Sequence, residues 1–366
     1  MPQPSAKPLA GIRVVTLAEQ YPGPYATLLL ADLGAEVVIV ERPQGGDPAR
    51  LFPQFHAAMN RNKRAVTLDL KTEAGRDGLR ALLATADVLM EGYRPGTMQR
   101  LGFGYDDVAL LQPGIVYVSI TGFGQTGPYR DRPAHDLSYQ AVAGMMHAQA
   151  RQGGTALPGD VAIGDLSSGM FAALGTMAAL IERARTGRGR HVDVSMTDGL
   201  VSWMSALLVP TMNAQPLPDV SSEPGYGVFR CGDGRLLTLS IAHEDWFWRP
   251  LCELLGLHDA AELGRTERIA RATSLQEAIA ARLASAPRAE WAQRFDAAGI
   301  PWGPVHDLPE VAADPHFRDR ALFTDVTEAD GTQRRYVAQP LMFDGLRPGP
   351  ERGAPALGEG NAQLLA

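Results

Sequence analysis

The chain has 366 residues, a net charge of −7, 45% hydrophobic residues and 20% charged residues. These values are ordinary for a folded globular protein, and the acidic balance argues against nucleic acid as a partner. The two cysteines, Cys231 and Cys252, cannot form a disulfide framework, which favours a reducing compartment. No apolar run reaches about 18 residues, the length of a membrane span. We therefore expect a cytoplasmic protein without a membrane partner.

The first 121 residues alternate between short apolar strands and helical segments. Strands are expected at 12–17, 36–41, 65–70, 87–90 and 115–121, with helices at 24–33 and 72–86. Runs of β-branched residues that alternate with helices predict a parallel sheet covered on both faces. The fold class predicted for this half is α/β.

The pattern changes after residue 121. A Gly/Pro-rich loop at 122–133 precedes helices expected at 136–146 and 166–185. In the second helix, large apolar residues recur every three or four positions, which predicts a packed face; they are Met170, Phe171, Leu174, Met177 and Ile181. Prolines, serines and acids then accumulate, which indicates a linker. A hairpin at 227–241, helices at 244–255, 275–284 and 289–298, and a turn at 299–304 follow.

The loop after the first strand, AEQYPGP at 18–24, does not predict a nicotinamide site. A dinucleotide fingerprint needs three glycines, and only Gly23 is present. Two prolines also remove backbone N–H donors. Glu41 ends the second strand, where a ribose-binding acid would lie, but alone it is a weak signal. No zinc-type spacing occurs either, so we expect neither a metal nor a tightly bound cofactor.

Seven ordered segments resemble one superfamily. They are PLAGIRVV (8–15), LADLGAEVVIVERP (30–43), NRNKRAVTLDL (60–70), DVLMEGYRPG (87–96), TGFGQTGP (121–128), GD (164–165) and RTGRGR (185–190). By these segments the chain is identified as a member of the family III coenzyme A transferase superfamily, the CaiB/BaiF-like proteins. The superfamily also contains α-methylacyl-CoA racemase, which this chain resembles most in its motifs.

The resemblance also implies an architecture. It is a Rossmann-like large domain with a parallel sheet, a smaller inserted α/β domain, and an interlocked homodimer. We accordingly expect the large CoA-binding domain at 1–209, the linker at 210–226 and the small domain at 227–325. The segment 326–366 is expected to return to the large domain.

Within the superfamily, the motifs favour a racemase. In AHDLSY (134–139) the histidine matches a catalytic base of racemases, and Glu244 falls where racemases have a supporting glutamate. Racemases tend to place proline after that glutamate, whereas this chain has Asp245. We expect an acyl-CoA racemase or epimerase that inverts the α-carbon of a 2-methylacyl-CoA-type thioester. His135 and Asp165 would be the two bases that exchange the α-proton through an enolate, with Glu244 orienting His135.

The alternative is a family III CoA-transferase, which moves CoA between carboxylic acids. In that function the carboxylate of Asp165 attacks the thioester, giving a mixed anhydride and then an aspartyl-CoA thioester. No histidine is needed for these steps. Asp165 is therefore expected to matter under either function.

Coenzyme A would enter as part of the acyl-CoA substrate, and its phosphates require cations near loop ends. Most of the candidates lie at or just after strands, where ligands collect in open α/β sheets. The resemblance implies CoA contacts for Arg42 and Arg100 and places Tyr139 near the pantetheine channel. The residues expected to bind the cofactor part of the substrate are Arg42, Lys63, Arg94, Arg100, Asp136 and Tyr139.

Overall fold

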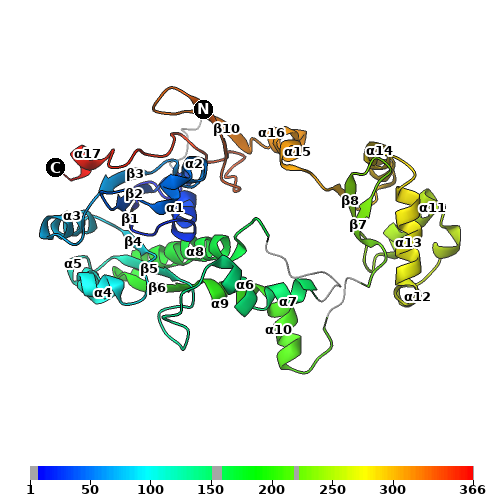
Figure 1. Ribbon diagram of the computed structural model, residues 1–366, viewed down its shortest axis with the longest axis horizontal. Helices are drawn as coiled ribbons and strands as arrows, with labels where there is room; N and C mark the ends of the chain where they lie inside the picture. The colour runs from blue at the N-terminus through cyan, green and yellow to red at the C-terminus, as the bar shows by residue number, and fades with distance from the viewer. Residues whose placement is uncertain (1–6, 151–158, 218–221, 366) are drawn as a thin grey trace. The chain divides into compact units, whose positions relative to one another are not determined.

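The computed structural model describes residues 7–150, 159–217 and 222–365 (Figure 1). The chain divides into two compact units, 1–205 together with 316–366, and 206–315. Residues 218–221 of the expected linker lie outside the described residues. The first residues of that linker, 210–212, belong to helix α10 (Ser205–Met212). The expected boundary between 325 and 326 falls inside strand β10 (Phe323–Thr327).

The first unit is built on a six-stranded parallel sheet with the order β3-β2-β1-β4-β5-β6. The strands are β1 (Arg13–Thr16), β2 (Glu36–Glu41), β3 (Arg64–Thr67), β4 (Val88–Glu91), β5 (Val116–Thr121) and β6 (Arg190–Ser195). This is the Rossmann strand order, so the predicted Rossmann-like α/β fold is confirmed. The strand order reverses between β1 and β4, and such sheets bind ligands at the carboxyl ends of the strands beside that point.

Two hydrophobic cores lie on opposite faces of this sheet. Val14 of β1 packs into one core with α1 (Pro22–Asp32) and α8 (Ile163–Thr186). Its neighbour Val15 packs into the other core with α3 (Glu73–Leu83). Successive side chains of a strand point to opposite faces, so a run of apolar residues fills both cores at once.

Helix α8 buries mainly small residues, which differ from most of the large residues predicted for its packed face. It packs against α1, β5 and β6 through small side chains, which include Ala172, Ala173, Thr176 and Ala179. The larger residues Met170, Leu174 and Ile181 are instead 51%, 58% and 66% exposed. Phe171 and Met177 of the predicted face are partly buried against this core, so the prediction holds for two of its five residues and is wrong for the other three. Periodicity located an apolar face but did not reveal that close contact with α1 selects small residues.

By length and composition, α8 is also long and apolar enough to cross a membrane. No such segment was expected from the sequence, because no apolar run reaches about 18 residues. Here α8 contributes buried residues to one of the two cores of the sheet.

The remaining elements of the first unit connect or flank the sheet. They are η1 (Pro48–Leu51), α2 (Pro53–Asn60), α4 (Thr97–Leu101), α5 (Tyr105–Leu111), α6 (Asp136–Val142), α7 (Met145–Ala150), α9 (Met196–Trp203), α16 (Pro315–Asp319), β11 (Gln333–Val337) and α17 (Asn361–Leu364). The single helix expected at 136–146 is interrupted between α6 and α7, where Gly144 has a left-handed φ of +83°. Strands β10 and β11 form an antiparallel pair.

The second unit combines a three-stranded antiparallel sheet with helices. Its strands are β7 (Tyr226–Arg230), β8 (Leu236–Ser240) and β9 (Trp302–Pro304), and β9 pairs with β8 where only a turn was expected. Its helices are α11 (Asp245–Leu255), η2 (His258–Ala260), α12 (Arg265–Ala270), α13 (Ala272–Leu283), α14 (Arg288–Ala298) and α15 (Leu308–Ala313). The fully buried Trp248 and Phe295 belong to its core.

Candidate active site

A cavity of about 570 Å³ lies at the carboxyl ends of β1, β4 and β5. Four of the residues expected at the active site line it: Arg94, His135, Tyr139 and Asp165. His135 precedes α6 and Asp165 lies in the first turn of α8, so the fold brings together two residues that are thirty positions apart. The cavity also lies where the strand order predicts ligand binding.

Asp165 combines burial with an unfavourable charge environment. Burial, and then the negative charge of Asp136, raise the pKa of the Asp165 carboxyl to about 7. Removal of water from a carboxylate disfavours its charged form and makes it a stronger base and nucleophile. Near neutral pH, Asp165 can therefore either carry a proton or attack a carbonyl carbon.

Asp136, which was expected to contact the cofactor part of the substrate, binds groups of the protein itself. Its Oδ1 atom accepts hydrogen bonds from the backbone N–H groups of Gly164 at 2.6 Å and Asp165 at 3.1 Å. Its Oδ2 atom accepts a bond of 2.5 Å from Nε2 of Gln140. Asp136 thus caps the N-terminus of α8 and fixes the backbone of Asp165. The two N–H groups that it occupies are not free to stabilise an enolate.

His135 is an exposed N-cap residue of α6. Its carbonyl accepts hydrogen bonds from Ser138 and Tyr139, and its side chain makes no capping bond. The helix therefore does not need the imidazole.

Tyr139 is buried, and its ring forms part of the cavity wall. Its hydroxyl donates a hydrogen bond of 2.8 Å to the carbonyl of Ala134. Burial, followed by the charges of Asp165 and Asp136, raises the pKa of Tyr139 to about 12. A Cβ atom on Gly122 would lie only 2.5 Å from the Tyr139 ring, so glycine is required for this packing. The ring shapes the cavity, while the hydroxyl is already bonded within the protein.

Glu244 belongs to the second unit, where it is the N-cap residue of α11. Its Oε2 atom accepts a hydrogen bond of 2.8 Å from the N–H of Ala242, and this bond is the main cause of its lowered pKa. The buried Arg268 supports the same loop through bonds to Asp245 at 2.5 Å and to the carbonyl of Ala242 at 3.3 Å. The expected role of Glu244 in orienting His135 stays a prediction.

The four expected cationic contacts have different environments. Arg94 lines the cavity, whereas the exposed Arg42, on the loop after β2, and the exposed Arg100, in helix α4, lie outside its wall. Lys63 is completely buried and donates hydrogen bonds of 2.8 Å to the Pro24 carbonyl and to Oδ1 of Asn60. The expectation that Lys63 contacts a CoA phosphate is therefore wrong for this structure. The lysine ties the start of α1 to the end of α2.

Sequence reasoning missed several residues of the cavity wall, among them Glu19, Gln20, Tyr21, Tyr93, Arg130 and Arg132. Those at 19–21 and 93 follow β1 and β4 directly, so the switch-point rule could have identified them. Arg130 and Arg132 belong to the loop at 122–133. The course of an irregular loop is set by tertiary contacts, and no periodicity in the sequence reports it.

Other features of the described residues are weaker candidates for chemistry. A cavity of about 510 Å³ lined by parts of α1, α2 and β11 contains no acid or histidine, and burial raises the pKa of its Tyr25 and Tyr336 hydroxyls, which disfavours their ionised forms. No group of three potential ligands among His, Cys, Asp and Glu forms a metal site in the parts of the chain that the structure describes. The flexible side chains of Met145 and Met146 and the ring of Trp203, which would suit an acyl chain, do not line the 570 Å³ cavity.

Comparisons with known proteins agree with these features. The family model for CoA-transferase family III matches residues 9–361. The chain is 32% identical to the succinate–glutarate CoA-transferase of Agrobacterium fabrum, over 98% of this chain and 95% of that protein. It is also 32% identical to the acetyl-CoA:oxalate CoA-transferase of Acetobacter aceti, with the same coverage.

Solved structures give the same result. A CAIB/BAIF family protein from Brucella suis is 29% identical, with a TM-score of 0.87 over 98% of both chains. The Rv3272 protein of Mycobacterium tuberculosis is 33% identical, with a TM-score of 0.87 over 99% of both chains. The motifs, the fold and these matches agree, and the chain belongs to the family III CoA-transferases.

Proposed function

We propose that this protein is a CoA-transferase that moves coenzyme A between carboxylic acids, with Asp165 as the nucleophile. The observation that carries the proposal is a half-buried carboxyl group with a pKa of about 7 on the wall of the cavity at the sheet's switch point. The names of the relatives support transfer over the racemase function that the motifs favoured, because these relatives are CoA-transferases.

In the proposed reaction, Asp165 is the protein group that becomes covalently modified, and every bond that forms is matched by one that breaks. An Asp165 oxygen attacks the thioester carbonyl, the C–S bond breaks, and CoA leaves as a thiolate. The thiolate attacks the Asp165 carbonyl of the anhydride, which releases the first acid and leaves an aspartyl-CoA thioester. The carboxylate of the second acid attacks this thioester and expels the CoA thiolate. That thiolate then attacks the second acyl carbonyl, which forms the new acyl-CoA and restores Asp165.

We further propose that one of the two acids carries a second carboxylate. Arg94 and Arg132 line the same cavity as Asp165, and neither side chain has a hydrogen bond or ion pair with another described residue. The Arg132 guanidinium lies 5.2 Å from the centre of the Tyr129 ring, and this cation–π contact leaves its N–H groups free to donate to an anion. Arginine suits planar carboxylates because it can bind both oxygens. Several relatives are named for diacids, such as succinate, glutarate and mesaconate.

Racemisation remains a second candidate because His135 and Asp165 line one cavity. Two bases on opposite sides of an α-carbon would invert it without transferring CoA. The two functions predict different products from the same acyl-CoA.

Two assays on the same preparation distinguish these functions. The first follows CoA transfer from succinyl-CoA to a panel of acids, with the wild type, Asp165→Asn and His135→Ala. The second follows α-deuterium exchange of single-enantiomer 2-methylacyl-CoA in D₂O with no acceptor acid. The proposal predicts transfer that Asp165→Asn abolishes, with transfer kept in His135→Ala. Exchange with loss of chirality that His135→Ala abolishes, and no transfer, would establish the racemase instead.

We also propose that the protein is a homodimer. The support is the exposed apolar face of α8, where Met170, Leu174 and Ile181 are each more than half exposed. Exposed apolar faces of this kind are typical of interfaces between subunits.

A further inference from the structure

The loop at residues 19–22 holds a strained residue in the wall of the active-site cavity. Gln20 has a left-handed φ of +66°, which residues with a Cβ atom rarely adopt. Glu19, Gln20, Tyr21 and Pro22 all line the cavity. Backbone strain of this kind persists only where the surrounding structure holds it in place.

The group that holds this loop is the carboxylate of Asp47. The N–H of Gln20 donates to both of its oxygens, at 3.1 Å to Oδ1 and 3.0 Å to Oδ2. Asp47 is only 3% exposed, and its Oδ1 atom also accepts a bond of 2.8 Å from the N–H of Ala49. One buried side chain thus connects the loop after β2 to the loop after β1.

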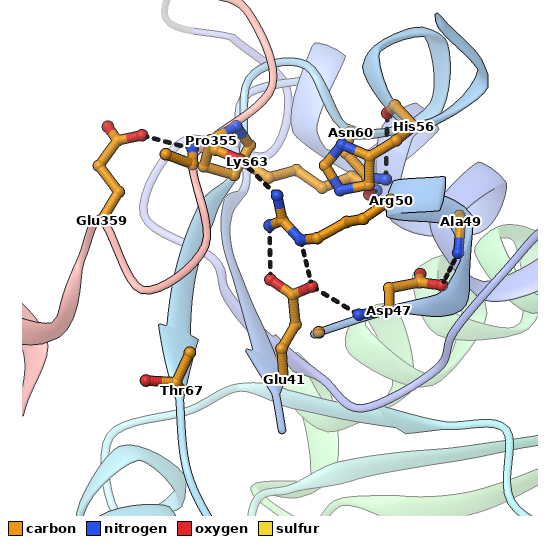
Figure 2. A network of polar contacts seen from close by, with 12 residues as sticks. Glu41, Asp47, Ala49, Arg50, His56, Asn60, Lys63, Thr67, Pro355 and Glu359 are labelled. Atoms are coloured by element: carbon orange, nitrogen blue, oxygen red, sulfur yellow. Dashed lines mark hydrogen bonds and ion pairs between the residues drawn. The ribbon is translucent and has the colours of Figure 1, made fainter. Parts of the chain in front are cut away.

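A buried ion pair fixes Asp47 in turn, as Figure 2 shows. Arg50 donates to both oxygens of Glu41, at 2.7 Å and 2.6 Å, and Oε1 of Glu41 also accepts the N–H of Asp47 at 2.9 Å. Gly46 permits this arrangement, because a Cβ atom there would lie 2.6 Å from Oε1 of Glu41. The Gly46 carbonyl accepts a bond of 2.8 Å from Nε of Arg42, so the expected CoA contact is anchored to the same loop.

We propose that Asp47 is a positioning residue that holds the loop at 19–22 in the conformation needed for CoA transfer. Asp47 does not itself line the cavity, so it acts through the backbone of Gln20. The kinetic test of this role measures CoA transfer and therefore rests on the proposed transferase function. A purely structural role would lower stability without changing the turnover of the folded enzyme.

The first test is a rescue experiment. Asp47→Asn replaces one acceptor oxygen with a donor NH₂ group, and we expect kcat for CoA transfer to fall about 10- to 100-fold, the range for a misplaced active-site group. Adding Gln20→Gly should recover about tenfold of this loss, because glycine adopts the left-handed conformation without steric cost. The Gln20→Gly single variant supplies the reference for the double variant.

Asp32→Asn is the matched control. Asp32 is another fully buried carboxylate of the first unit, bonded to Nη2 of Arg61 at 2.6 Å and Nδ2 of Asn62 at 2.7 Å, and it does not line the cavity. It should lower the melting temperature, leave kcat per folded enzyme unchanged, and show no rescue by Gln20→Gly. The same behaviour in Asp47→Asn would overturn the proposal.

If Asp47→Asn does not fold, a second pair of variants tests whether CoA transfer needs the left-handed backbone at residue 20. Gln20→Val makes the left-handed backbone costly, whereas Gln20→Asn keeps an amide and tolerates that backbone. The proposal predicts a much lower kcat for Val than for Asn; equal values would refute it.

Amide hydrogen exchange provides a test that does not depend on activity. Exchange of the peptide that contains Gln20 should be faster in Asp47→Asn than in the wild type or Asp32→Asn. Unchanged exchange would refute the positioning role, whereas a wild type that transfers no CoA would refute only the proposed function.

Discussion

At the scale of single residues, the chemistry depends on two aspartates at the start of α8. Asp165 lies in its first turn, and Asp136 binds the N–H groups of that turn. Asp136 uses its carboxylate to cap the helix, and its negative charge helps to raise the pKa of Asp165 to about 7. The same side chain therefore fixes the backbone of Asp165, the proposed nucleophile, and increases its basicity. The sequence identified both residues, but the division of roles depends on distances between atoms of separate elements.

The raised pKa predicts a pH dependence with a defined sign. Only the ionised form of Asp165 attacks a thioester, so kcat/KM should rise with pH through about 7 and then level off. Asp136→Asn removes a neighbouring negative charge, which should lower the pKa of Asp165 and shift this rise to lower pH. The measurement is kcat/KM for acyl-CoA over a range of about pH 5.5 to 9, which extends to both sides of this pKa. A flat profile, or a shift to higher pH in Asp136→Asn, would contradict the assignment.

The unpaired arginines predict substrate preference. Replacing Arg94 or Arg132 with alanine should raise the KM for a dicarboxylic acceptor about tenfold or more, because charge-assisted hydrogen bonds are lost. A monocarboxylic acid of similar length serves as the internal control, and its KM should change little. Equal losses for both acids would assign these arginines to CoA instead.

At the scale of elements, the position of Asp165 depends on close packing between α8 and α1. A Cβ atom on Gly169, one turn after Asp165, would lie 2.8 Å from the Pro22 carbonyl oxygen and 2.9 Å from Cδ1 of Tyr25. The start of α1 lines the active-site cavity at Pro22, so displacement of either helix changes the cavity.

Gly169→Ala should therefore destabilise the protein by about 1–3 kcal/mol and also lower kcat. Gly175→Ala is the control on the same helix, because its Cβ atom would meet a methyl group of Val192 in β6, at 2.9 Å, and neither residue lines the cavity. Helix propensity favours alanine there by about 1 kcal/mol, which offsets part of the cost of this contact, so kcat should stay unchanged. Thermal unfolding and kcat measured on both variants check this prediction, and equal behaviour of the two would refute it.

The sequence predicted the positions of strands and helices better than it predicted which elements they pair with or pack against. The strands up to β5 were identified because β-branched runs such as EVVIVE of β2 leave little alternative. Strand β6, RHVDVS, was missed because charged residues interrupt it, and it is defined by its pairing with β5. The apolar residues of α8 were predicted to form one packed face, but only Phe171 and Met177 pack against the core, since periodicity does not say what covers a face.

The same limit applies to the candidate site. The motifs located His135, Asp165, Arg94 and Tyr139, which do line one cavity. They also suggested Lys63, which is buried, because a cation near a strand looks the same in sequence whether it faces solvent or the core.

At the scale of the whole molecule, the exposed face of α8 predicts self-association. Ile181 is 66% exposed and Leu174 is 58% exposed in the single chain. A charge buried in a dimer interface without a partner is costly, so Ile181→Glu should convert the dimer to monomers. Light scattering during size-exclusion chromatography measures the mass directly, with Arg188→Glu as an exposed control on the neighbouring turn. A monomeric wild type would refute the dimer, and an unchanged Ile181→Glu dimer would move the interface elsewhere.

The most direct test of Asp165 as the nucleophile is to trap the covalent intermediate. The protein is mixed with succinyl-CoA, treated with borohydride or hydroxylamine, and mapped by peptide mass spectrometry. The proposed mechanism predicts a modification at Asp165 that requires acyl-CoA and is absent in Asp165→Asn. CoA transfer without any modification at Asp165, or with the modification at another residue, would contradict it.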